Sequence, residues 1–284
     1  MPEVRVWLVG AGPGDPELLT VKALRLIQTA DTILYDALVG TEILGFARPG
    51  TQLLAVGKRA GRHAMPQPAI NAALVAAARG SARVVRLKGG DPTMFGRLTE
   101  EMDALRRAGI AFEVVPGVTA ACAAAAAAQV SLTRRGCAQS VTFVTGHAQA
   151  GSQLDLDWPA LADARSTLAI YMGKSAAREI RDGLLSHGLA ATTPVRALAD
   201  VGRREQRESI LTLGALDTVA EAGGYGPLLI LIGAAMSGAH APACGDSRLA
   251  SQRRGDVPGG QANTSPDGTT ATNEISQTVT EART

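Results

Sequence analysis

Short apolar runs alternate with segments of helical periodicity through the first half of the chain. The apolar runs end in glycine, aspartate or proline, and the segments between them place apolar residues on one face of a helix. Strands are predicted at 4–9, 32–35, 52–56, 83–87 and 112–115, and helices at 18–28, 68–79 and 99–108. This alternation is typical of an α/β fold, in which helices pack on a mostly parallel sheet.

A second set of elements follows Pro116 and Gly117, which together interrupt regular strand pairing. Strands are predicted at 141–144, 168–171, 195–199, 209–213 and 228–232, and helices at the alanine-rich segment 118–129 and at 176–185. We therefore expect two α/β lobes, an N-terminal one at 1–116 and a C-terminal one at 117–236. Small molecules usually bind in clefts between such lobes.

The composition changes at residue 237. The segment 237–284 is rich in Ser, Thr, Gly, Pro and Asn and has few large aliphatic residues. Such a segment buries too little apolar surface to offset the entropy lost on ordering, so a disordered C-terminal tail is predicted.

The N-terminal segment does not resemble a signal peptide, because Glu3 and Arg5 interrupt its apolar stretch. The longest apolar run, at 120–128, is nearly all alanine and shorter than the roughly 20 residues that span a bilayer. These features predict a cytoplasmic protein without a membrane partner.

Composition argues against a nucleic-acid partner, and the spacing of the histidines argues against a metal site. The 28 Lys and Arg residues nearly balance the 26 Asp and Glu residues, and aromatic residues make up 3% of the chain. A nucleic-acid surface would need a basic stripe and stacking aromatics, so no nucleic-acid partner is expected. The four histidines show no metal-ligand spacing, and no metal is expected.

The first glycine cluster, at residues 10–15, follows a predicted strand and allows two interpretations. It is similar to the G-x-G-x-x-G turn of dinucleotide-binding proteins, and Asp31 stands about where a ribose-binding acid is found. However, its third glycine comes one place early and Pro13 interrupts it. The alternative is a tight turn that only redirects the chain.

The second glycine cluster follows the predicted strand at 83–87. Gly89 and Gly90 leave the backbone open to a ligand at the carboxyl end of the strand. Asp91 adds a carboxylate suited to ribose hydroxyls or to a cationic ligand. A cationic, adenosine-bearing ligand fits both features, and the alternative is a turn begun by Asp-Pro.

Taken together, the motifs resemble those of the uroporphyrinogen-III C-methyltransferases of the tetrapyrrole methylase family. The resemblance spans about residues 4–233 and depends on GAGPGDPELLT (10–20), YDALV (35–39), VGKRAG (56–61), RLKGGDPTMFGR (86–97), VVPGVTAA (114–121), SLTRR (131–135), AQSVTFVTGH (138–147) and TLAIYMGK (167–174). It implies two α/β lobes with the cofactor cleft between them. It also implies transfer of two methyl groups from S-adenosylmethionine to uroporphyrinogen-III, which gives precorrin-2 for sirohaem or cobalamin biosynthesis.

The resemblance assigns roles to individual residues. It implies that Asp36 accepts a proton and that Lys58 donates one. It implies that the first glycine turn is not a phosphate site. The donor pocket that it implies comprises Pro13, Gly89, Gly90, Asp91, Met94, Thr119, Ala120, Met172 and Val201.

The implied substrate carries eight carboxylates, which call for arginines that grip carboxylates in pairs. Arg59, Arg62, Arg97 and Arg135 are the expected anchors. Arg134 departs from the family, whose members commonly have histidine there. S-adenosylhomocysteine is the expected by-product, and a homodimer is implied. The NAD-dependent module of the fused sirohaem synthases has no place before residue 10, so the reaction is expected to stop at precorrin-2.

Three alternatives remain open on the sequence. The first is a later corrin-pathway methyltransferase with the same fold and donor. The second, suggested only by the first glycine turn and Asp31, is an NAD-dependent dehydrogenase. The third is a non-catalytic sensor of adenosyl ligands.

Overall fold

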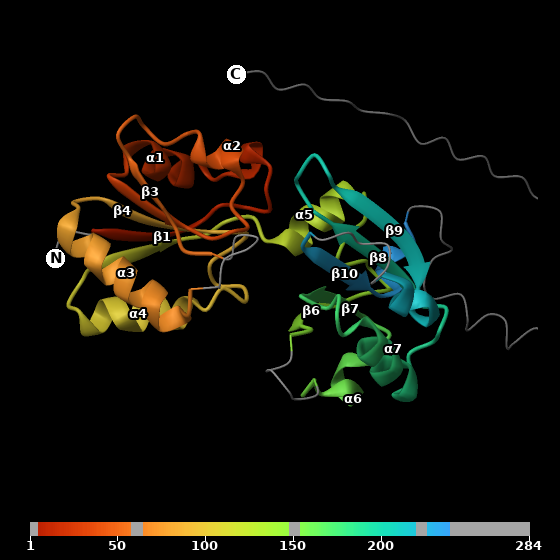
Figure 1. Cartoon of the computed structure of the whole chain (residues 1–284). Coiled ribbons are helices and arrows are strands. Elements are labelled where there is room, and N and C mark those ends of the chain that lie inside the picture. Colours follow the sequence, from red (N-terminus) through yellow and green to blue (C-terminus); the bar gives the residue numbers. More distant parts are fainter. Residues whose placement is uncertain (1–4, 58–64, 148–153, 220–225, 239–284) are drawn as a thin grey trace, which may run out of the picture. The chain divides into compact units, whose positions relative to one another are not determined.

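A computed structural model describes residues 5–57, 65–147, 154–219 and 226–238 of the chain (Figure 1). The first sheet has five strands in the order β3-β2-β4-β1-β5, and every pairing between them is parallel. Its strands are β1 (Val6–Gly10), β2 (Thr32–Tyr35), β3 (Gln52–Ala55), β4 (Val84–Lys88) and β5 (Phe112–Val115). The central strands β2 and β4 are buried along their whole length, as expected for a parallel sheet covered on both faces.

Helices cover both faces of the first sheet. One apolar core lies between the sheet and helices α1 and α2, and the other lies between the sheet and helices α3 and α4. These helices are α1 (Val21–Thr29), α2 (Thr41–Leu44), α3 (Gln67–Gly80) and α4 (Leu98–Arg107). The start of α1 is fixed by Thr20, whose side chain accepts a hydrogen bond from the Ala23 N–H at 3.1 Å.

The strand order places a switch point between β1 and β4. The chain leaves β1 toward β2 on one side of this point, and it leaves β4 toward β5 on the other side. Ligands of open α/β sheets bind at such points, outside the carboxyl ends of the strands. The two glycine clusters of the sequence follow β1 and β4, so both lie at this edge.

The second sheet differs from the first in the direction of its strands. It has the order β6-β7-β10-β8-β9, in which only β6 and β7 are parallel neighbours. Its strands are β6 (Ser140–Thr145), β7 (Ser166–Tyr171), β8 (Pro194–Ala199), β9 (Arg207–Thr212) and β10 (Leu228–Ile232). The central strand β10 is apolar and fully buried.

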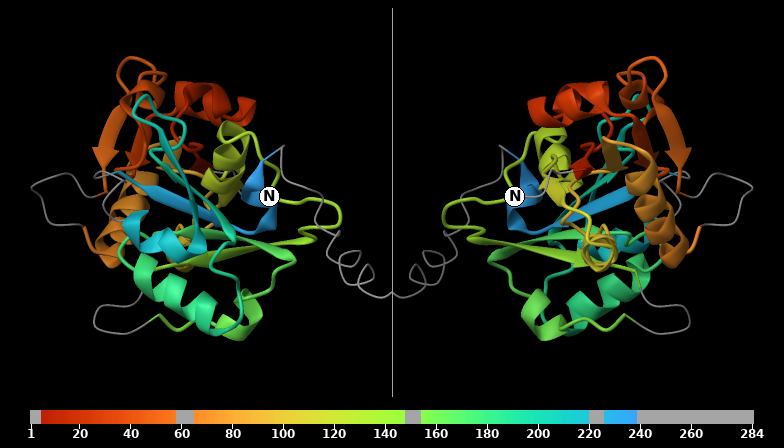
Figure 2. Two further views of the ribbon diagram at one scale, coloured as in Figure 1. Left: turned by 90° about the vertical axis from the view of Figure 1, so that its right-hand side faces the viewer. Right: turned by 90° about the vertical axis from the view of Figure 1, so that its left-hand side faces the viewer.

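Both faces of the second sheet are also covered. Helix α5 (Ala120–Ala127) and the 3-10 helix η3 (Ala234–Ser237) pack on one face, where alanine allows close approach. Helices α6 (Trp158–Leu161) and α7 (Ala177–Ser186) pack on the other face, together with η2 (Leu213–Thr218). Figure 2 shows α7, in green, lying along this face.

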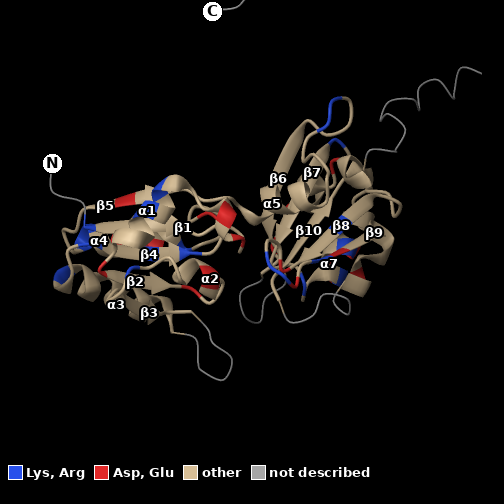
Figure 3. Cartoon of the chain, turned by 90° about the horizontal axis from the view of Figure 1, so that it is seen from above, with Lys and Arg blue, Asp and Glu red and all other residues tan. Residues whose placement is uncertain are grey.

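The predicted α/β fold class is confirmed, since two sheets with helices on both faces are present. The division of the chain into lobes at 1–116 and 117–236 stays a prediction. Apart from Ser237 and Gly238, the predicted tail lies outside the described residues. In the described residues both signs of charge are interspersed (Figure 3). Each helix there is too short or too polar to cross a bilayer.

Candidate functional site

A cavity of about 350 Å³ lies at the carboxyl edge of the first sheet, within the size range of small-molecule sites. Loops after β1, β2 and β4 form part of its wall, and the ends of β7 and β10 form another part together with the loop after β8. Eleven of the predicted site residues line it, namely Pro13, Asp36, Gly89, Gly90, Asp91, Met94, Arg97, Thr119, Ala120, Met172 and Val201.

The remaining four predicted site residues fall into two cases, one that the structure describes and three that it does not. Arg135 is exposed, in the segment between α5 and β6, and does not contribute to the wall. Lys58, Arg59 and Arg62 lie outside the described residues. The structure therefore brings the predicted donor-binding residues together. Of the two predicted carboxylate anchors that it describes, it places Arg97 in the cavity wall and Arg135 outside it.

The first glycine turn serves a structural purpose. Gly12 and Gly90 form a reciprocal bridge, in which the Gly12 N–H donates at 3.1 Å and the Gly90 N–H donates at 2.7 Å. Pro13 lines the cavity. Asp31 precedes β2, at the edge of the sheet opposite to the cavity, and its carboxylate pairs with Arg48. This placement argues against the dinucleotide interpretation, which needs an acid at the carboxyl end of the second strand.

The second glycine cluster is held close to the start of α5. A Cβ built on Gly117 would lie 2.4 Å from the Gly90 carbonyl oxygen, so only glycine fits at position 117. A Cβ on Gly90, where φ is +68°, would meet no atom within 4 Å. Open space beside an unsubstituted backbone suits a ligand that lies against the loop. The cavity therefore has both the size and the bare backbone that an adenosyl ligand needs.

The Asp91 carboxylate also braces this loop. One oxygen accepts hydrogen bonds from the backbone N–H and the hydroxyl of Thr93, at 2.8 and 2.5 Å. The other oxygen accepts from the Gly117 N–H at 2.9 Å. The first oxygen thus uses both of its lone pairs, whereas the second keeps one that a ligand hydroxyl can use.

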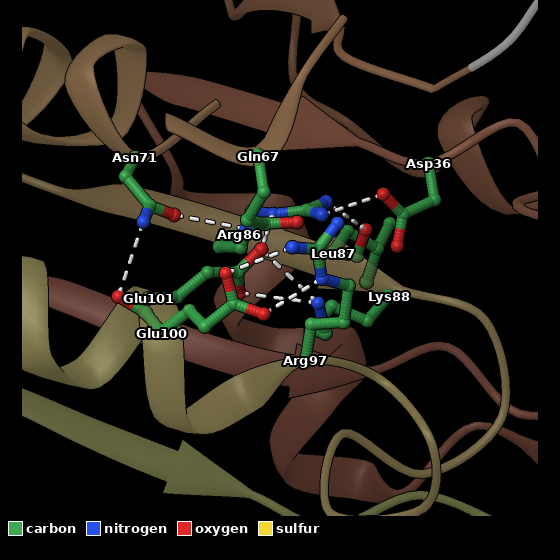
Figure 4. A network of polar contacts seen from close by, with 9 residues as sticks. All are labelled: Asp36, Gln67, Asn71, Arg86, Leu87, Lys88, Arg97, Glu100 and Glu101. Carbon is green, nitrogen blue, oxygen red and sulfur yellow. Dashed lines mark hydrogen bonds and ion pairs between the residues drawn. The ribbon is translucent and has the colours of Figure 1, made fainter. Parts of the chain in front are cut away.

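A buried ionic cluster of Asp36, Arg86, Lys88 and Glu101 adjoins the cavity (Figure 4). Glu101, on α4, has no exposed surface, and it accepts hydrogen bonds from Arg86 Nε at 2.9 Å and from Lys88 Nζ at 3.1 Å. Arg86 also donates to Asp36 Oδ1 at 2.5 Å. Two cations and two anions thus balance one another, as buried charges must.

Lys88 ends strand β4 and forms part of the cavity wall. Burial lowers the pKa of its ammonium group below the ordinary value, and the adjacent Arg86 lowers it further. Glu101 and Asp36 act in the opposite direction, but their effects are smaller than that of burial. The cavity thus has a lysine whose proton is held more weakly than in water.

Tyr171 links β7 to the start of α5. Its hydroxyl lies 2.5 Å from Thr119 Oγ1 and accepts a hydrogen bond from the Ala121 N–H at 3.1 Å. Burial raises the pKa of the Tyr171 phenol. Its ring packs against Phe95 and Phe143, with centroids 5.1 and 6.4 Å away. Phe95 and Tyr171 both line the cavity, so an apolar surface with a fixed hydroxyl lies there.

Arg203 connects the loop after β8 to the loop after β2. Its guanidinium donates to the Leu38 carbonyl oxygen at 2.7 Å, and its Nε is buried with no hydrogen-bond partner among the described residues. Its Cγ would lie 2.7 Å from a Cβ on Gly14, so glycine at that position makes room for the arginine. The first glycine turn thus accommodates a side chain from the second sheet.

Arg97 comes just before α4 and lines the cavity. Its guanidinium donates to both oxygens of Glu100, at 2.7 and 2.8 Å, and its side chain is 58% exposed. Any substrate carboxylate that binds Arg97 has to compete with Glu100.

Sequence reasoning missed Leu38, Arg86, Lys88, Glu101, Tyr171 and Arg203. Arg86 and Lys88 alternate with Leu87 in an otherwise apolar strand, and two cations on one face of a buried strand indicate nearby anions. This pair of cations was visible in the sequence RLKGGDPTMFGR (86–97). Glu101 and Arg203 gave no comparable signal, because charged residues are ordinary on helices and loops. Among the described residues, no group of three potential metal ligands occurs.

Comparison with known proteins assigns the chain that forms this cavity to a family. The family model of tetrapyrrole (corrin/porphyrin) methylases matches residues 5–217. The chain belongs to this family. As a member it is a methyltransferase of the tetrapyrrole methylase type.

Individual relatives agree with this assignment. The siroheme synthase of Gluconobacter oxydans is 50% identical over 80% of the chain and 48% of its own length, and siroheme synthase 1 of Yersinia enterocolitica is 51% identical over the same shares. The chain thus spans about half the length of these curated relatives.

Solved structures also match. The uroporphyrin-III C-methyl transferase of Thermus thermophilus, complexed with S-adenosylhomocysteine, is 36% identical with a TM-score of 0.71, over 84% of the chain and 98% of that protein. A cobalt precorrin-4 methyltransferase is 31% identical with a TM-score of 0.72, over 82% of the chain and 95% of that protein.

Proposed function

We propose that the chain transfers two methyl groups from S-adenosylmethionine to uroporphyrinogen-III and so makes precorrin-2. The observation that carries this proposal is the 36% identity to a uroporphyrin-III C-methyl transferase across nearly its whole length. The siroheme synthases support it, since sirohaem is formed from the same product. The product serves sirohaem or cobalamin biosynthesis.

Residues of both sheets hold the donor in this proposal. The backbone at Gly89 and Gly90 lies along the adenosyl group, whereas Pro13, Asp91, Met94, Thr119, Ala120, Met172 and Val201 enclose it. When bound, S-adenosylmethionine supplies an electrophilic methyl group. The protein's main contribution is to hold donor and acceptor at reacting distance and to exclude water. The cavity, walled largely by apolar side chains, supports that role.

Asp36 is the proposed proton acceptor, because methylation of a pyrrole carbon requires a proton to leave the ring. Its carboxylate lines the cavity and is 27% exposed. Lys58 is the proposed proton donor on the strength of the family resemblance. Arg59, Arg62, Arg97 and Arg135 are the proposed anchors for substrate carboxylates, and Arg97 is supported by its place in the wall.

The alternative is a later corrin-pathway methyltransferase. The specific observation in its favour is the TM-score of 0.72 to a cobalt precorrin-4 methyltransferase, which is similar to that of the uroporphyrin-III enzyme. The higher identity to the uroporphyrin-III enzyme favours the first proposal.

The test is an anaerobic assay with uroporphyrinogen-III and methyl-labelled S-adenosylmethionine. We expect two labelled methyl groups per tetrapyrrole molecule. Asp36→Asn should lower kcat by about 100-fold or more, while S-adenosylhomocysteine still binds. Asp103→Asn, on the exposed side of α4, is the matched control and should leave kcat unchanged. Labelling of cobalt precorrin-4 but not of uroporphyrinogen-III would favour the alternative.

We also propose a cytoplasmic homodimer, as the resemblance implies. Sedimentation equilibrium of the full chain tests the dimer, and a monomer at micromolar concentration would contradict it.

A further inference from the structure

Arg86 has a separate acceptor for each nitrogen of its guanidinium group (Figure 4). Nε donates to Glu101 Oε1 at 2.9 Å, one terminal nitrogen donates to the Leu87 carbonyl at 3.1 Å, and the other donates to Asp36 Oδ1 at 2.5 Å. The residue is 1% exposed, so water offers no competing partner. The planar group is therefore fixed in position and orientation.

Glu101 supports this arrangement from the opposite side. It is fully buried and binds both Arg86 and Lys88. Without Glu101, two cations would face one partly exposed carboxylate, an arrangement that is costly away from water. The cluster thus runs from a closed end at Glu101 to an open end at Asp36.

At the open end, the two oxygens of Asp36 differ. Oδ1 accepts the Arg86 hydrogen bond, whereas Oδ2 accepts none from any other described residue. Since the carboxylate lines the cavity, Oδ2 is the oxygen left for a ligand. A carboxylate held at one oxygen by a rigid, buried donor keeps the other oxygen at a defined place.

We propose that Arg86, braced by Glu101, is a positioning residue that holds Asp36 so that Oδ2 receives the proton lost by the substrate. This inference rests on the proposed function. For each methyl group, a carbon–carbon bond forms on the ring and the carbon–sulfur bond of the donor breaks, with its electron pair left on sulfur. The ring gives up one proton to Oδ2, so a sulfonium and a carboxylate become a neutral thioether and a carboxylic acid.

A double-mutant cycle separates positioning from simple structural support. Arg86→Lys keeps the charge, but a single ammonium group cannot reach three acceptors that lie in different directions. We expect kcat to fall about 30-fold while both KM values and the dissociation constant for S-adenosylhomocysteine stay within about threefold. In the Asp36→Asn background, the same change should cost nothing further. Arg106→Lys, in a surface pair with Asp103 on α4, is the matched control and should leave kcat unchanged.

Two kinetic results would overturn the inference. One is a kcat for Arg86→Lys equal to that of the wild type. The other is an equal fold-loss with aspartate and with asparagine at position 36, because a general structural defect costs the same in both backgrounds. Should Arg86→Lys fail to bind S-adenosylhomocysteine, Glu101→Gln takes its place in the cycle. Glutamine keeps the shape of the glutamate side chain. We expect the same pattern, a loss of kcat with aspartate at position 36 and no further loss with asparagine there.

A measurement without substrate keeps this inference distinct from the proposed function. In protein labelled with ¹³C at the aspartate carboxyl, the resonance that disappears in Asp36→Asn belongs to Asp36. We expect Arg86→Lys to move that resonance and Arg106→Lys to leave it in place. An unmoved resonance would overturn the inference. Absence of methyl transfer by the wild type would instead overturn only the proposed substrate.

Discussion

The two sheets contribute different kinds of side chain to the same cavity. The first sheet and its loops supply the charged groups Asp36, Arg86, Lys88 and Asp91, together with the bare backbone of the second glycine cluster. The ends and loops of the second sheet supply the mostly apolar residues Tyr171, Met172, Leu228 and Leu229, with Arg203 as their charged exception. Most of the charged groups thus come from a parallel sheet whose carboxyl ends converge, whereas the second sheet mainly gives shape and excludes water.

This difference has a cost that is confined to the first sheet. Buried charges are stable only when paired, so each member of the ionic cluster depends on the others. The second sheet has an ordinary apolar core, in which single side chains act more independently. Changes in the first sheet should therefore alter stability and catalysis together, and changes in the second core should alter stability alone.

The largest expected effect is that of Glu101→Leu. Removal of the buried carboxylate leaves Arg86 and Lys88 without their shared partner, and the free energy of unfolding should fall by about 3–5 kcal/mol. Urea denaturation measures the loss. Glu100→Leu, one position earlier and exposed, is the control and should change the value by less than about 1 kcal/mol. A similar small loss for both variants would mean that the cluster adds nothing.

Ile180→Ala tests the other side of the comparison. Ile180 is fully buried between α7 and the second sheet and does not line the cavity. Its truncation should lower the free energy of unfolding by about 3 kcal/mol and leave kcat per folded molecule unchanged. Denaturation and the methyl-transfer assay on the same preparation check both values. A large fall in kcat would show that the second core also controls the chemistry.

Tyr171→Phe removes the hydroxyl that joins β7 to α5. The variant loses the contact with Thr119 and leaves the Ala121 N–H without this acceptor. The free energy of unfolding should fall by about 1–2 kcal/mol. The aromatic packing with Phe95 remains, so binding of S-adenosylhomocysteine, measured by calorimetry, should weaken only slightly. Complete loss of binding would mean that the hydroxyl contacts the ligand directly.

The smallest effect concerns the pH dependence contributed by Lys88. Its pKa is lowered in the folded chain, so the unfolded chain binds more protons between the folded pKa and the ordinary value of 10.5. Stability from this group therefore rises with pH in that window. The free energy of unfolding is measured for the wild type and for Lys88→Met across this pH range. The difference between the two isolates the contribution of Lys88 from that of other titrating groups, including Tyr171. A difference that falls as pH rises toward 10.5 would contradict the assignment.

Much of the fold followed from local patterns. Strands β2 and β5 begin and end where their apolar runs do, and α3 was anticipated to within a residue at each end. Helices α2 and α6 were missed, because four residues are too few to show a helical period. The antiparallel pairing in the second sheet could not be predicted either, since an apolar run does not reveal which strands lie beside it or in which direction they run.

The site was predictable where it depends on backbone and on positions after strands. Asp36 and the second glycine cluster follow parallel strands, and the structure brings both to the cavity. The link from Arg86 to Glu101 was not predictable, because it joins a strand to a helix that leaves from the end of the following loop. Arg203 was missed for a similar reason, as its partner Leu38 is 165 residues away.

The most direct test of this account is a crystal structure of the chain with S-adenosylhomocysteine. We predict the ligand in the cavity at the carboxyl edge of the first sheet, with its adenosyl group against Gly89 and Gly90 and its sulfur on the side of Asp36. A ligand bound elsewhere on the chain, with this cavity filled by protein side chains, would contradict the account.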